Sequence, residues 1–303
     1  MSVLSQRRVS PAHGASIALV AATAVWGSTF IVVKDVIGRM AVTDFLFWRF
    51  AVATALLVVI RPRAVLRMSP GARRRGVLLG GFLGAGFLAQ TAGLRTTSAT
   101  VSGFVTGMMV VFTPLVAWLV LRQRVERSAW LGVAMATVGL GLLTVRGVSV
   151  GFGEALTLLG AAFYAFHIVG LGEWSRPDDA YGLTLVQAAT VAGLCLLLTA
   201  ADGHVALPPD RSAWWAVGFM AVAATAIGFM VQTWAQAHLP ATRAAVILTM
   251  EPVFAGVFAV VFAGEPLTWA ILVGGLLVVT AMLGVELGPR RGRDATVPRL
   301  EAL

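Results

Sequence analysis

Glu251, followed by Pro252, is the residue of this chain best placed to do chemistry. The pair lies about ten residues into an apolar run that begins at 241, near the middle of a bilayer's hydrocarbon core. A carboxylate there is costly, and a proline frees the carbonyl of Leu248, four residues earlier. Together the two groups could hold a proton or another cation. Alternatively, Glu251 pairs with Arg243 or caps local polar groups, although residues eight apart cannot touch along an unbroken helix.

Two cations also lie within apolar runs. Lys34 is the only lysine of the chain and shares a helical face with Trp26. It either binds an anionic group of a substrate or extends to the outer membrane interface. The long side chain of lysine allows its charge to reach the interface at a low cost in free energy. For Arg49 we favour a structural role, in which it fixes a helix end or pairs with Asp44 one turn away.

Uncharged polar and aromatic residues form a second set of candidates. Gln232 and Gln236 share one helical face, and Gln90 lies at the position that matches Gln232 in an internal repeat described below. Such side chains bond helix to helix or line a cavity. Because they come from many apolar segments, we expect a cavity. The full set is Trp26, Thr29, Gln90, Thr106, Tyr164, His167, Gln232, Trp234 and Gln236, together with Pro114 and Pro252 as predicted helix kinks.

The composition places all these residues in a membrane protein. Apolar residues make up 58%, charged residues only 12%, and the mean hydropathy is +0.86, which excludes an ordinary water-soluble domain. About 20 apolar residues are needed to cross about 30 Å of hydrocarbon. The sequence therefore predicts an all-α polytopic membrane protein with ten transmembrane helices. They are expected at 15–36, 44–60, 76–94, 99–121, 128–145, 153–171, 182–200, 213–236, 241–263 and 267–287.

The carboxyl half of the chain repeats the amino half. QTAGLRTTSAT at 90–100 aligns with QTWAQAHLPAT at 232–242, a displacement of 142 residues. Identity is low, about nine positions in roughly fifty. Five helices per repeat is an odd number, so the second repeat must enter the membrane from the opposite face. We expect an amino-terminal tail at 1–14, inverted five-helix repeats at 15–145 and 146–287, and a carboxyl-terminal tail at 288–303.

The distribution of basic residues predicts the orientation. The net charge is +9, and with both termini in the cytoplasm 16 of the 23 basic residues face that side and four face the other. This bias is the positive-inside rule, and it predicts a multi-pass protein of the cytoplasmic membrane with both termini cytoplasmic. Binding to nucleic acid is not needed to explain the charge.

Several motifs, in their order and spacing, resemble the EamA family of the drug/metabolite transporter superfamily. They include WGSTFIVVK at 26–34, FWRF at 47–50, the segment 96–124 and LTMEPVFAGVFAVVFAGEPL at 248–267. The sequence departs from the family at Gln123, where members often carry an acidic residue, while the second half retains Glu265. The resemblance implies a ten-helix secondary transporter of small metabolites, often an exporter, with a central cavity.

These observations together predict a secondary transporter that works by alternating access. We expect an exporter of amino-acid-like or other small polar or amphipathic compounds, and coupling to a proton or another ion is part of this hypothesis. The alternative is a lipid translocase or passive facilitator with a central groove. An enzyme is not expected, because the sequence has no HExxH motif and its four histidines lack metal-ligand spacing. We expect no cofactor and no metal; the predicted partners are a small-molecule substrate and the bilayer.

Overall fold

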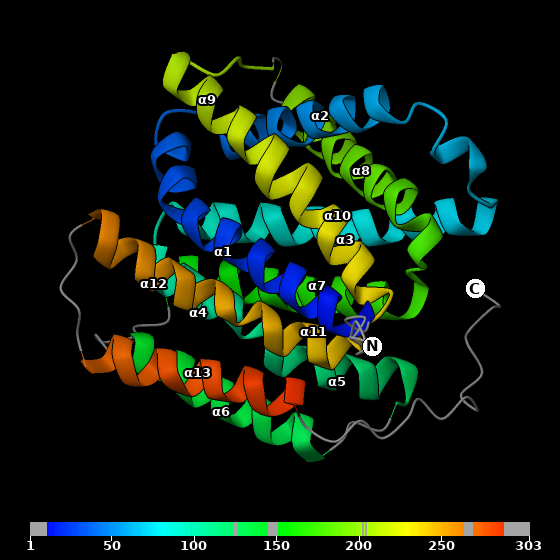
Figure 1. Ribbon diagram of the computed structural model, residues 1–303. Helices are drawn as coiled ribbons and strands as arrows, with labels where there is room; N and C mark the ends of the chain where they lie inside the picture. Colours follow the sequence, from blue (N-terminus) through cyan, green and yellow to red (C-terminus); the bar gives the residue numbers. More distant parts are fainter. Residues whose placement is uncertain are drawn as a thin grey trace, which may run out of the picture.

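The computed structural model describes residues 11–97, 99–123, 127–144, 151–201, 203, 205–263 and 269–287. Within these residues the chain forms helices and no strands, and the helices lie together in one bundle (Figure 1). Residues 1–10 and 288–303 of the predicted tails, and Glu265, lie outside this part. The first helix begins at Pro11, so residues 11–14 of the predicted tail belong to it.

Five of the predicted spans are continuous α-helices close to their expected bounds. They are α1 (Pro11–Ile37), α2 (Val42–Ile60), α3 (Pro70–Leu94), α7 (Phe152–Trp174) and α8 (Ala180–Ala201). Short 3₁₀ turns precede two of them, at Val65–Arg67 and Pro177–Asp179. The Ser69 side chain caps α3 by accepting a hydrogen bond from Ala72 N, and Pro70 occupies the first turn, where a missing N–H costs nothing.

Three further spans are interrupted near their middle. The first consists of α4 (Ala99–Gly107) and α5 (Met109–Leu121), and the second of α9 (Arg211–Phe219), the π-helical segment η3 (Met220–Ile227) and α10 (Gly228–Gln236). The third consists of α11 (Ala241–Leu248) and α12 (Met250–Ala263). The two remaining helices, α6 (Arg127–Thr144) and α13 (Trp269–Leu287), pack against each other along one edge of the bundle (Figure 1).

Eight of the ten predicted spans coincide with helical segments that are long and apolar enough to cross a membrane. The other two, α6 and α13, contain shorter apolar stretches, Trp130–Gly139 and Leu272–Ala281. The described residues thus support a multi-pass membrane protein, and the count of ten stays a prediction.

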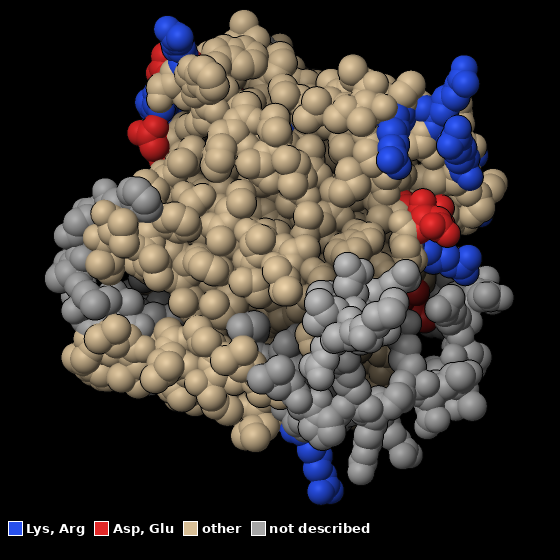
Figure 2. Space-filling model, in the orientation of Figure 1, with Lys and Arg blue, Asp and Glu red and all other residues tan. Residues whose placement is uncertain are grey.

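The surface of the bundle carries an apolar belt between two charged ends. Charged side chains gather at opposite ends of the molecule in Figure 2, and the tan face between them shows no charged side chain. Large apolar side chains such as Val59, Leu197 and Leu276 are exposed. A water-soluble monomer does not expose so large a contiguous apolar surface, so this belt faces lipid. The start of α1 and the end of α13 lie at the same end as the arginine-rich connection between α2 and α3 (Figure 1).

The interruptions in the fourth and ninth spans fall at matching positions in the two halves. The fourth breaks at Met108 and the ninth at Thr249, within one residue of the 142-residue displacement. Pro252 lies in the first turn of α12, where its missing N–H leaves no gap in the helix ladder. Pro114 lies inside α5, past the break at Met108. The predicted association of a helix break with a proline therefore fits the ninth span better than the fourth.

Gly27 permits the closest backbone contact around Glu251. A methyl group at this position would lie 2.7 Å from the Glu251 carbonyl oxygen and 2.8 Å from Ala255 N. Since both of these are backbone atoms, they cannot move aside as a flexible side chain could. Helix α1 therefore approaches α12 at the turn that carries Glu251 only because residue 27 has no side chain.

We predict that Gly27→Ala separates α1 from α12, costs about 1–3 kcal/mol of stability and lowers transport activity. Thermal unfolding of the detergent-purified protein measures the first effect. The control is Gly14→Ala on the same helix, where a methyl group meets no atom within 4 Å and stability should hold or rise slightly. Equal melting temperatures for the two variants would contradict the close contact.

Candidate substrate cavity

A cavity lies near the middle of the bundle, between helices of both halves of the chain. Its walls come from α1, α2, α3, α4 and α5 of the first half and from α7, α10, α11 and α12 of the second. The volume open to the centres of water-sized molecules is about 80 Å³, several times the 10–15 Å³ that one water needs. The cavity can therefore hold a few waters or part of a small organic molecule.

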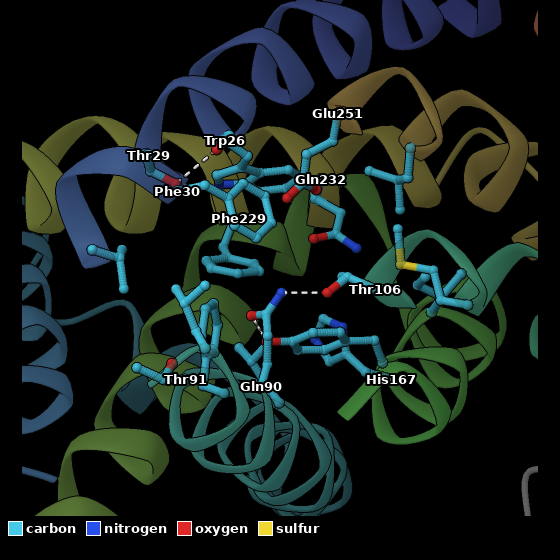
Figure 3. Close-up of a pocket in the computed structure, with 18 of the residues that line it drawn as sticks. Trp26, Thr29, Phe30, Gln90, Thr91, Thr106, His167, Phe229, Gln232 and Glu251 are labelled. Carbon is cyan, nitrogen blue, oxygen red and sulfur yellow. Dashed lines mark hydrogen bonds between the residues drawn. The ribbon is translucent and has the colours of Figure 1, made fainter. Parts of the chain in front are cut away.

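Eight of the residues predicted from the sequence line this cavity. In Figure 3, Trp26, Glu251 and Gln232 lie on one side of it, and Gln90, Thr106 and His167 lie on the opposite side. Phe229 projects between the two groups. The full set of predicted lining residues is Trp26, Thr29, Gln90, Thr106, Tyr164, His167, Gln232 and Glu251. The structure thus brings together side chains up to 225 residues apart in sequence.

Trp26 is fixed by the π-helical segment of the eighth span. In a regular α-helix the Gly228 N–H would bond to the Ala224 carbonyl, but here it bonds to the carbonyls of Ala223 and Thr225. The Ala224 carbonyl instead accepts a 2.7 Å hydrogen bond from Trp26 Nε1. The indole also lies so close to Gly228 that a methyl group there would be 2.9 Å from Nε1. Thus the π-helix supplies the carbonyl acceptor and glycine supplies the space.

A chain of polar side chains crosses the opposite wall. The Tyr164 hydroxyl donates to Gln90 Oε1 at 2.8 Å, and Gln90 Nε2 donates to Thr106 Oγ1 at 2.7 Å. These bonds link α7, α3 and α4 and fix the orientation of the Gln90 amide. The wall therefore presents hydrogen-bonding groups in a set geometry rather than mobile ones.

A second polar network joins α10 to α7, beginning at Gln232 of the cavity lining. Gln232 Nε2 donates to Gln236 Oε1 at 3.0 Å, and Gln236 Nε2 donates to the Ile168 carbonyl at 2.7 Å. Nearby, His167 Nε2 lies 2.6 Å from Gln187 Oε1, which can only accept, so Nε2 carries a hydrogen. Gln236 is fully buried and joins α10 to α7 beneath the cavity.

Arg49 also lines the cavity, which sequence reasoning did not predict. It is 3% exposed, its Nε donates to Thr225 Oγ1 at 2.7 Å, and its guanidinium carbon lies 4.6 Å from the centre of the Phe87 ring. The predicted partner, Asp44, instead accepts hydrogen bonds from the Thr199 hydroxyl and from Ala206 N. The sequence shows an arginine within an apolar run, which marks Arg49 as unusual. It does not show in which direction the side chain points or how deeply it is buried.

Comparison with known proteins agrees with this arrangement. The profile of the EamA-like transporter family matches residues 13–145 and again residues 151–287. This chain belongs to the EamA-like transporter family. The same profile matching twice along the chain accords with the internal repeat.

Several relatives of this EamA-like transporter are named as transporters. An "Uncharacterized transporter" of Archaeoglobus fulgidus is 29% identical over 294 residues, covering 90% of this chain and 86% of that protein. A "Probable terminal-alkyne amino-acid exporter" of Streptantibioticus cattleyicolor is 29% identical over 120 residues, covering 39% and 40%. A crystal structure shares the fold with a TM-score of 0.72 and 18% identity, covering 90% of this chain and 96% of the other.

Three predicted site residues, Lys34, Trp234 and Gln236, lie outside the cavity lining of this transporter. Lys34 is exposed, and its ammonium group donates to the Thr97 carbonyl at the end of α3. Thr97 in turn donates through its hydroxyl to Glu154 at the start of α7. Trp234 is partly buried and packs against His238, with ring centres 4.9 Å apart. Lys34 thus joins helix ends beside the cavity rather than pointing into it.

Arg39 makes a second connection at the same end of the bundle. Its guanidinium forms ion pairs with Asp35 on α1 and with Asp210, which precedes α9. Asp210 also caps α9 by accepting a 2.8 Å hydrogen bond from Ala213 N. This backbone bond, followed by the Arg39 partner, lowers the pKa of Asp210 below the usual 3.8. The charged form of Asp210 therefore holds the end of α1 to the start of α9.

We predict that Trp26→Phe destabilises the protein by about 1–3 kcal/mol, because the Ala224 carbonyl loses its indole donor at a buried position. Thermal unfolding in detergent measures the loss. Trp215→Phe is the control, since Trp215 is 69% exposed, and it should leave the melting temperature nearly unchanged. A Trp26→Phe variant as stable as its control would show that the indole bond contributes little.

We also predict an acid-dependent loss of stability from Asp210. A lowered pKa means that its stabilising contribution is present above about pH 4 and is lost as the pH falls through the folded-state value. Asparagine at position 210 can still accept the capping hydrogen bond from Ala213 N, but it carries no charge. The loss of stability between pH 4 and pH 3 that comes from Asp210 should therefore disappear in Asp210→Asn. Melting curves from pH 7 to pH 3 test it, with the exposed Asp178→Asn as control. Superimposable pH profiles for Asp210→Asn and the unmodified protein would refute the assignment.

Proposed function

We propose that this protein is a secondary transporter that exports small amphipathic, amino-acid-like compounds by alternating access through the central cavity, with Glu251 as a proton site. One observation carries the proposal: a cavity between the two halves encloses a carboxylate beside a helix break, in a protein of a transporter family. Intramembrane carboxylates are costly and are retained where ions or substrates pass.

The matching halves support alternating access. The family profile matches each half, both halves line the cavity, and the helix breaks at Met108 and Thr249 occupy corresponding positions. In transporters built from inverted repeats, discontinuous helices meet at a midplane site and the two halves rock around it. We infer that the two halves here are inverted repeats that move in this way.

The position of Glu251 supports coupling to protons. It lies in the first turn of α12, and its side chain lines the cavity next to Gln232 (Figure 3). The Glu251 backbone is held by the glycine contact with α1, so rocking of α1 against α12 would change the surroundings of the carboxylate. A carboxylate whose environment alternates in this way binds a proton on one side and releases it on the other.

Two observations support an amphipathic, amino-acid-like substrate and its export. The cavity combines amide and hydroxyl groups with aromatic and aliphatic walls, including Phe30, Leu83 and Phe229. One relative, over part of its length, is named a probable amino-acid exporter. We therefore place the substrate among compounds with a polar head and a small apolar side chain.

We expect Glu251→Gln to abolish the pH dependence of transport while leaving the protein folded, because the amide is nearly the same size but cannot take up a proton. Metabolite profiling of cells with and without the protein first identifies a compound that accumulates in the medium. Uptake of that compound into inside-out vesicles is then measured from pH 5.5 to pH 8.

Glu173→Gln is the matched control, since Glu173 accepts a hydrogen bond from Gln123 outside the cavity and should not affect the pH profile. An unchanged pH dependence in Glu251→Gln would remove proton coupling from the proposal. Movement of fluorescent phospholipid between leaflets, without flux of any small metabolite, would favour a lipid translocase and reject the carrier.

A further inference from the structure

Arg49 is a buried cation without an acidic partner in the described part of the chain. The ion pairs there join Arg39 to Asp35 and Asp210, at the end of the bundle. Arg49 lies inside α2, and within the described residues its side chain makes one hydrogen bond, from Nε to the Thr225 hydroxyl. A neutral hydroxyl does not balance a full charge, and an unbalanced charge in a membrane interior is costly. The two terminal nitrogens of the guanidinium remain available for a ligand.

The guanidinium is held in a fixed plane. Its central carbon lies 4.6 Å from the Phe87 ring centre and 5.3 Å from the Phe50 ring centre. Cation–π contacts of this kind stabilise the charge without using its N–H donors. The bond to Thr225 fixes the Nε edge, and Thr225 belongs to the same π-helical segment that holds Trp26. These contacts orient the guanidinium before any ligand arrives.

Glu251 is the opposite charge of the same cavity, yet it does not pair with Arg49. The two side chains interact electrostatically, but no nitrogen–oxygen distance between them falls within the 4.0 Å of an ion pair. Both residues line the cavity. A purely structural pair would close this gap, because attraction strengthens as distance falls in a low-dielectric interior. The gap instead leaves the terminal nitrogens of Arg49 without a hydrogen-bond partner among the described residues, on a side chain that lines the cavity.

We propose that Arg49 binds the carboxylate group of the transported compound, so that the site selects small carboxylates with an apolar remainder. The planar fork of N–H donors on arginine matches the two oxygens of a carboxylate. Phe87 and Phe229 then lie where the apolar part of the ligand would pack. This inference rests on the proposed function, in that the central cavity is the transport site. In this proposal Arg49 has the anion-binding role that the sequence analysis considered for Lys34.

Binding of matched probe compounds to the purified full-length protein tests this role. The probes are L-phenylalanine and L-leucine, each compared by equilibrium dialysis with its methyl ester, which keeps the amine and side chain but lacks the carboxylate. We expect the unmodified protein to bind at least one free acid about 10- to 100-fold more tightly than its ester. In Arg49→Gln that preference should vanish, while binding of the ester stays the same.

Two further variants allow the proposal to be tested even if Arg49→Gln does not fold. Thr225→Val keeps the charge but removes the Nε anchor, so it should reduce the preference for the free acid by about three- to tenfold. Arg61→Gln is the control, since Arg61 lies over the Tyr181 ring outside the cavity and should leave the preference intact.

The inference is overturned if each ester binds as well as its free acid, if neither acid binds the folded protein, or if Thr225→Val leaves the preference unchanged. Failure here is distinguishable from failure of the proposed function. A protein that exports a metabolite without preferring carboxylates would refute the role of Arg49 and leave the transporter proposal standing.

Discussion

Every backbone polar group inside a bilayer needs a partner, and this constraint governs where the structure can be irregular. The interruptions at Met108, at Thr249 and in η3 all lie in spans that line the cavity. Side chains supply hydrogen bonds at two of these interruptions: Trp26 donates to the Ala224 carbonyl, and the Thr249 hydroxyl donates to the Val246 carbonyl, which also accepts from Thr249 N. Among the described spans, the three interrupted ones all contribute to the cavity, where polar side chains are available as partners.

Close packing of small residues sets how the cavity is shaped. A methyl group on Gly86 would lie 2.5 Å from the Tyr164 ring, and one on Gly160 would lie 2.9 Å from the Gly86 carbonyl. Helices α3 and α7 thus approach closely enough for Tyr164 to bond with Gln90. In hydrocarbon, such contact between backbones takes the place of the hydrophobic effect as the force joining helices. The glycines position the polar wall although none of them contacts the cavity.

Sequence reasoning anticipated the helices and most of the polar lining, because length, apolar content and helical spacing are local properties. It did not anticipate which cation enters the cavity. Lys34 and Arg49 both occupy apolar runs, so what separates them is the depth and rotation at which each helix places its cation. Packing sets both: Lys34 reaches the Thr97 carbonyl at a helix end, whereas Arg49 is enclosed by Phe87 and Thr225. The π-helical segment likewise has no marker in the sequence.

The two charges of the cavity become interdependent once their proposed roles are combined. With Glu251 ionised and Arg49 charged, the empty cavity has no net charge, although its charges are not paired. An amino-acid-like ligand adds no net charge, but its carboxylate on Arg49 and its ammonium group enter a low-dielectric space, in which Glu251 attracts positive charge strongly. The ammonium group and a proton would then compete for Glu251, so each should weaken the binding of the other. Such competition would couple export of the ligand to entry of protons, without any direct contact between Arg49 and Glu251.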